Sequence, residues 1–70
     1  MTLKIGKYRH FKGSVYRVLL LARHSETDEE LVIYHPLNTP NDVWVRPLNM
    51  FDETIVRHGV SLKRFVFVEN

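Results

Sequence analysis

The stretch from Arg23 to Thr27, RHSET, gathers the side chains that acid–base or nucleophilic chemistry requires. His24 and Glu26 are residue types that transfer protons once their pKa values are tuned. Ser25 would need a base within hydrogen-bond reach, and neighbouring strand residues point to opposite faces, so adjacency to His24 makes no dyad. The sequence contains no G-x-S-x-G elbow, phosphate-binding glycine loop or H-E-x-x-H motif. A non-catalytic role is favoured, with a small hydrolase or nucleotide-processing accessory using His24 and Glu26 as an alternative.

Four histidines raise the question of a metal site: His10, His24, His35 and His58. No two of them have the i, i+2 spacing that places side chains on the same face of a strand. The chain has no cysteine, which excludes a thiolate zinc site. Histidines at half-exposed strand positions usually bond to backbone or water. We therefore expect neither a metal site nor another cofactor.

The short stretch WVRP at 44–47 is the clearest candidate for recognition. Alternation along a strand would point Val43 and Val45 inward and leave Trp44 and Arg46 together on the other face. Exposed Trp and Arg side by side are typical of binding hot spots, and Arg can stack on a ring. The alternative is that Trp44 covers an open end of the fold while Arg46 pairs with an acid from SETDEE.

Basic and acidic residues are distributed unevenly along the chain. Six basic residues precede Glu26, the first acid, and the remainder carries four basic and eight acidic residues. The basic segment also contains Tyr8, Phe11 and Tyr16, so it could contact phosphates and stack on bases. The net charge of only +2 favours another interpretation, in which the cations form a solvated face and the rings lie in the core.

Runs of β-branched and aromatic residues, separated by turn-forming residues, predict a protein made of short strands. The turn KGS joins the first two strands, and proline closes each of the next two. In chain order, the predicted elements are strands at 7–11, 15–24, 31–35 and 43–46, one helical turn at 47–51, and two strands around His58-Gly59, the second being RFVFV.

The apolar run from Val18 to Ala22 has the greatest consequence for packing. On a regular strand, Val18, Leu20 and Ala22 share one face while Leu19 and Leu21 share the other. A flat one-layer sheet would leave one of these apolar faces exposed to solvent. We therefore expect either a curled sheet or a homodimer formed through one sheet face, and predict an all-β fold. In that fold, residues 1–70 form a single small SH3-like barrel of five or six short antiparallel strands with one short helical turn.

Composition limits the class of protein further. A hydrophobic content of 44% is too high for intrinsic disorder. No apolar stretch approaches the roughly 20 residues of a membrane span, and none resembles a signal peptide. A small secreted domain would usually carry disulfides. We expect a soluble cytoplasmic protein with no membrane partner.

Four separated blocks carry a resemblance to a known family: GKYRHFKGSVYRV at 6–18, ARHSETDEELVIY at 22–34, WVRPLNMFDETI at 44–55 and RF at 64–65. In these blocks the chain resembles a bacterial family known only as domain-of-unknown-function family 1653. The resemblance covers nearly the whole chain but implies no established activity. It does suggest a shared site in the polar blocks YRH, RHSET and WVRP, which core packing alone does not explain.

These observations predict a non-catalytic binding module that recognises a peptide, a nucleic acid or a small anionic ligand through an aromatic and basic groove. A barrel that binds RNA or single-stranded DNA is a narrower alternative. The predicted ligand-binding residues are Tyr8, Arg9, His10, Arg23, His24, Ser25, Glu26, Thr27, Trp44 and Arg46.

Overall fold

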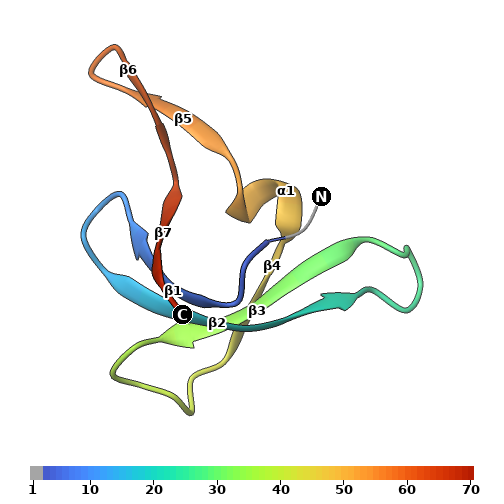
Figure 1. Ribbon diagram of the computed structural model, residues 1–70. Helices are drawn as coiled ribbons and strands as arrows, with labels where there is room; N and C mark the ends of the chain where they lie inside the picture. Colours follow the sequence, from blue (N-terminus) through green and yellow to red (C-terminus); the bar gives the residue numbers. More distant parts are fainter. Residues whose placement is uncertain (1–2) are drawn as a thin grey trace.

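The computed structural model describes residues 3–70 as two antiparallel sheets and one short helix (Figure 1). The larger sheet has five strands in the order β4-β3-β2-β1-β7, and β5 pairs only with β6. The β5–β6 hairpin extends away from the larger sheet. The elements are β1 (Gly6–His10), β2 (Val15–Arg23), β3 (Glu30–Pro36), β4 (Trp44–Pro47), α1 (Leu48–Phe51), β5 (Thr54–Arg57), β6 (Val60–Lys63) and β7 (Phe65–Glu69).

The predicted all-β class is confirmed, and so is the single helical turn after Pro47. Residues 3–70 form seven strands instead of five or six, because the last segment bends at Arg64 between β6 and β7. Within residues 3–70 no ladder joins the edge strands β4 and β7, so the sheet does not close into a barrel. No helix in this part of the chain is long and apolar enough to cross a membrane.

Aromatic rings make up most of the core. Phe51 of α1 stacks on Phe65 of β7 with ring centroids 4.0 Å apart. Tyr8 and Tyr34 meet the Phe51 ring edge-on, each at 5.3 Å. Val18 and Val32 complete the buried set. We call the side of the five-stranded sheet that carries these residues the inner face, and the opposite side the outer face.

The apolar run in β2 does not alternate as expected, because a β-bulge interrupts it. Val18 lies opposite Tyr34 and Leu20 lies opposite Ile33, so Leu19 is the extra residue. After the bulge the alternation restarts, and Leu21 packs against the core while Leu19 and Leu20 are exposed. The predicted grouping of Leu19 with Leu21 on one face is therefore wrong, and these two residues form no shared surface for a homodimer.

The turn between β5 and β6 is set by two residues with positive φ. His58 has φ 53° and Gly59 has φ 77°, and the flanking Arg57 and Val60 pair directly. Positive φ at both central residues defines the two-residue hairpin turn whose twist matches that of the strands. The predicted strand–turn–strand at His58-Gly59 is confirmed.

Candidate functional site

Trp44 and Arg46 lie on the inner face of β4, while Val43 and Val45 are exposed. The predicted orientation, with the two valines inward, is wrong. Its cause is the pairing with β3: Trp44 lies opposite Tyr34, and Arg46 lies opposite Val32. Directly opposed residues on neighbouring strands share a face, so the two buried residues of β3 bring Trp44 and Arg46 to the core side.

Arg46 is fixed by two contacts over the core. Its Nε donates a hydrogen bond of 3.1 Å to the Tyr34 hydroxyl. Its guanidinium carbon lies 5.7 Å from the centre of the Phe65 ring, within range of a cation–π interaction. Among residues 3–70 no acid forms an ion pair with Arg46, so its expected partner in SETDEE is not found. The charge of Arg46 is available to a ligand.

Trp44 packs beside Arg46 at the rim of the core. Its ring lies 5.8 Å from both Tyr16 and Tyr34, and 40% of the residue remains exposed. No acceptor for the indole N–H is found within the described part of the chain. Trp44 thus offers a partly open ring and a free donor.

His10, at the end of β1, faces the same region. Its ring lies 4.9 Å from Phe65 and 6.4 Å from Tyr16. Nδ1 accepts a hydrogen bond of 3.2 Å from the backbone N–H of Lys12, so the neutral ring carries its proton on Nε2. Burial lowers the pKa of His10 below its ordinary value, and the nearby charges of Arg64, Arg46 and Lys12 lower it further.

These side chains form one surface, the aromatic–basic face, which consists of His10, Tyr16, Trp44 and Arg46 above a floor of Tyr34 and Phe65. Arg64 borders it, with Nη2 3.0 Å from the Glu53 carboxylate. Arg46, the Trp44 indole and neutral His10 present only donors, and the Tyr16 hydroxyl can also donate. The face is therefore suited to a ligand that is planar or apolar in part and rich in hydrogen-bond acceptors.

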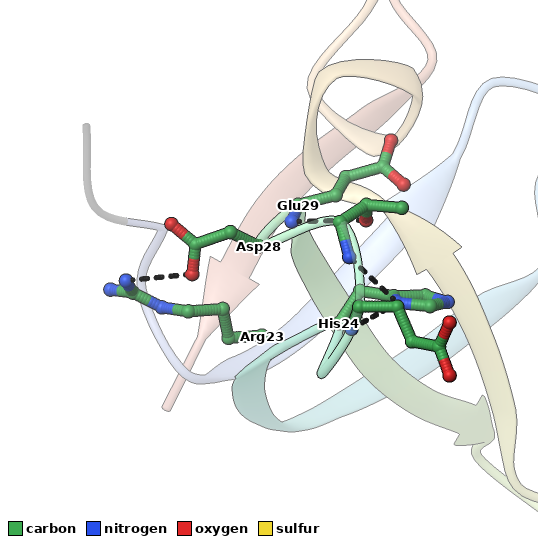
Figure 2. A network of polar contacts seen from close by, with 6 residues as sticks. Arg23, His24, Asp28 and Glu29 are labelled. Carbon is green, nitrogen blue, oxygen red and sulfur yellow. Dashed lines mark hydrogen bonds and ion pairs between the residues drawn. The ribbon is translucent and has the colours of Figure 1, made fainter.

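The RHSET segment forms the turn after β2 and not part of this face. The Nδ1 atom of His24 accepts hydrogen bonds from the backbone N–H groups of Glu26, at 3.1 Å, and of Thr27, at 3.3 Å. An ion pair of 3.0 Å joins Arg23 to Asp28 across the turn (Figure 2). All of these residues are exposed. His24 thus uses its ring to organise its own turn.

Strand register separates this turn from Trp44. Trp44 lies level with Tyr34, whereas Arg23 lies level with Glu30, four residues away along β3. That separation is about 13 Å at strand spacing. The turn instead borders α1 across a hollow of about 270 Å³ lined by Asp28, Glu29, Glu30, Leu48 and Asn49. The structure therefore does not bring Arg23, His24, Ser25, Glu26 or Thr27 to the aromatic–basic face.

Of the predicted site residues, His10, Trp44 and Arg46 meet on the inner face. Tyr8 is buried in the core, and its hydroxyl donates 2.7 Å to the Lys4 carbonyl. Arg9 is exposed, at an alternating position of β1 between the inward-facing Tyr8 and His10. The predicted groove as a whole is thus not assembled.

Four residues of this surface or its border were absent from the predicted set: Tyr16, Tyr34, Phe65 and Arg64. Tyr16 could have been found from alternation, because it lies two residues before the core residue Val18 on the same strand. Arg64 belongs to the block RF that carries part of the family resemblance, but its sequence context alone gives no indication that β7 lies beside β1.

One hollow, about 790 Å³, lies away from this face and is lined by Lys4, Ile5, Gly6, Arg17, Phe67, Glu69 and Asn70. Another, about 450 Å³, reaches the edge of the face at His10. Within residues 3–70 no cluster of three or more His, Asp or Glu side chains could hold a metal ion. The aromatic–basic face combines free donors with partly open rings.

Comparison with known proteins decides the family. The model of a family of proteins of unknown function, DUF1653, matches residues 6–67. The chain belongs to the DUF1653 family. A crystal structure of a DUF1653 protein from Bordetella bronchiseptica is 37% identical in sequence, with a TM-score of 0.82, over 94% of this chain and 87% of that one. No curated protein matches the chain. The resemblance noted in the sequence is confirmed, and the DUF1653 assignment brings no established activity with it.

Proposed function

We propose that this DUF1653 protein is a non-catalytic binding module and that the aromatic–basic face is its ligand-binding surface. One observation carries the proposal: Arg46, Trp44 and His10 lie around a ring-lined floor, and the Arg46 Nη groups, the Trp44 indole N–H and the His10 Nε2 have no hydrogen-bond partner among residues 3–70. Unused donors beside open rings favour a ligand with an anionic group and a planar part.

The polar groups of the face also favour binding over catalysis. A nucleophile requires a base within hydrogen-bond reach. The described residues show no hydrogen bond between His10 and a hydroxyl, and the Nδ1 atom of His10 is occupied by the backbone of Lys12. The face supplies positive charge and aromatic rings, and both serve to bind a ligand.

Trp44 makes the proposal directly testable, because it is the only tryptophan of the chain and it lies in the site. Phenyl phosphate, which joins a ring to an anion, is expected to change Trp44 fluorescence saturably, whereas inorganic phosphate and benzyl alcohol bind more weakly. Arg46→Gln should weaken binding of phenyl phosphate about tenfold, as expected for loss of a charge-assisted hydrogen bond.

The matched control is Arg17→Gln, which removes one positive charge at an outward-facing position of β2. It should leave the fluorescence titration unchanged. Equal weakening in both variants would show that phenyl phosphate responds to net charge alone, and no saturable change in the wild-type protein would contradict the proposal.

A further inference from the structure

We infer that the ligand of the aromatic–basic face is a short segment of single-stranded nucleic acid, an inference that rests on the proposed function. Proteins that bind single strands combine rings on which bases stack with cations that follow the phosphates. The aromatic–basic face provides both, together with the adjoining β1–β2 turn and Arg57 of the β5–β6 hairpin.

The rings form a row from β4 to the β1–β2 turn. Trp44 lies 5.8 Å from Tyr16, Tyr16 lies 6.4 Å from His10, and His10 lies 4.4 Å from Phe11. Trp44 of β4 and Tyr16 of β2 lie on either side of β3, Tyr16 and His10 lie on the neighbouring strands β2 and β1, and Phe11 follows His10, so the row crosses the strands. Successive rings at these spacings could each receive a base.

Positive charges lie at both ends of this row. Arg46 stands beside Trp44 at one end, and the Lys12 ammonium and Arg57 guanidinium lie 5.8 Å and 5.2 Å from the Phe11 ring at the other. The ion pairs among residues 3–70 involve Lys7, Arg23, Lys63 and Arg64, so none of the three end cations is neutralised by an acid. They are free to contact phosphates.

Four of the eight acidic residues lie away from this row, whereas Asp42 lies two residues before Trp44 in the chain. Glu26, Asp28, Glu29 and Glu30 lie in or next to the turn after β2, roughly 13 Å along the strands from Trp44. This distance exceeds the Debye length of about 8 Å at physiological salt, so these four acids oppose a polyanion at the row only weakly.

The donors of the face favour a nucleic acid over an acidic peptide. An extended peptide brings one backbone N–H per residue and needs acceptors for these groups when they are buried. Arg46, Trp44 and neutral His10 offer no acceptor at their free atoms. Phosphates are acceptors and carry no N–H, so the backbone of an oligonucleotide satisfies the free donors of the face without burying backbone donors of its own.

The test is fluorescence anisotropy with 5′-fluorescein-labelled probes of one length: oligothymidine and oligouridine of eight nucleotides and an octaglutamate peptide. Unlabelled phenyl phosphate is titrated in parallel by Trp44 fluorescence. Both oligonucleotides are expected to bind, with log Kd rising by about two per decade of salt for three neutralised phosphates.

Substitutions test whether oligothymidine binds at the aromatic–basic face. Trp44→Ala should lower the affinity for oligothymidine by at least about fivefold, which is the lower limit for loss of one stacked base. Arg46→Gln should weaken it and reduce the salt slope by about 0.7, whereas Arg17→Gln should leave both unchanged. Trp44→Phe, which keeps a ring, should recover most of the affinity and excludes a loss that is due to unfolding.

The contrary results are distinct. Binding of phenyl phosphate or octaglutamate without either oligonucleotide would overturn the nucleic-acid inference and leave the proposed function standing. Equal losses in Arg46→Gln and Arg17→Gln would also overturn the inference, since charge alone would then account for binding. Failure of every probe would overturn both.

Discussion

Arg46 is held over the core by a hydroxyl and a ring. The Tyr34 hydroxyl accepts from Nε, and Phe65 lies under the guanidinium. This arrangement leaves the two Nη groups, the better pair for a bidentate contact with an anion, free of partners among residues 3–70. Tyr34 is thus a positioning residue, because it acts on a ligand only through Arg46.

Tyr34→Phe tests this role. The change keeps the buried ring and removes only the acceptor, so the free energy of unfolding should fall by about 1 kcal/mol. Affinity for phenyl phosphate should fall as well, because Arg46 loses its orientation. Tyr16→Phe is the control for stability, since the Tyr16 hydroxyl has no partner within residues 3–70 and its loss should cost under about 0.5 kcal/mol in urea unfolding. Equal destabilisation by both variants would contradict the role of Tyr34.

His10 predicts a defined pH dependence. Its pKa in the folded protein lies below the ordinary 6.5, first through burial and then through Arg64, Arg46 and Lys12. At pH values between the pKa of His10 in the folded protein and 6.5, the unfolded chain binds more protons than the folded protein does. The free energy of unfolding therefore falls as the pH drops from 6.5 towards the pKa of the folded protein. Above pH 6.5, His10 does not affect it. His10→Gln should remove this part of the pH dependence from chemical denaturation.

The same residue reports on Arg46. In an NMR titration of the His10 ring, Arg46→Gln should raise the pKa of His10, because one nearby positive charge is lost. Arg17→Gln should leave that pKa in place. A His10 that titrates above 6.5 in the wild-type protein would contradict the described surroundings.

At the scale of elements, the bulge in β2 decides which leucines pack. Leu19 is the extra residue and is exposed, whereas Leu21 contacts the core cluster. Leu21→Ala should therefore lower the free energy of unfolding by roughly 2 kcal/mol, and Leu19→Ala by less than about 0.5 kcal/mol. Urea unfolding of both variants measures the difference; similar losses would mean that β2 pairs without a bulge.

The contact between β1 and β7 predicts a second effect. A Cβ atom on Gly6 would lie 2.5 Å from the Glu69 carbonyl oxygen, at a backbone φ of 143°. Gly13 also has positive φ, 107°, but a Cβ there would meet nothing within 4 Å. Gly6→Ala should therefore cost about 1–3 kcal/mol more than Gly13→Ala in thermal or urea unfolding. Equal costs would show that β7 does not approach Gly6 closely.

Strand positions could be predicted from the sequence, but their faces could not. The strands and the two sharp turns follow from local signals: β-branched runs, KGS, Pro47 and His58-Gly59. Which residues of β4 face the core depends on which residues of β3 lie opposite them. The alternation of faces in β2 is interrupted by a bulge, and no residue type near Leu19 predicts this bulge. Trp44, Arg46 and His10 could therefore be identified as members of one site. The addition of Arg64 needed the tertiary pairing of β1 with β7.

The whole molecule leaves its main sheet open and keeps one group of acids away from the ring row. The cations near the ring row lack acidic partners, apart from Arg64, and the acids after β2 lie at the other end of the β2–β3 hairpin. A field of this kind orients an approaching anion before contact. Because no ladder closes β4 onto β7 within residues 3–70, the inner face stays accessible at the edge that carries Trp44.

The most direct test of the binding surface is a ¹H–¹⁵N NMR titration of the labelled protein with phenyl phosphate. The single Trp44 indole N–H gives one resolvable side-chain signal, and it should shift together with the backbone amides of His10, Tyr16 and Arg46. The assignment of the ligand-binding surface would be contradicted if the Trp44 signal did not shift. In that case the shifts would be confined to Gly6, Arg17 and Glu69, which line the hollow of about 790 Å³.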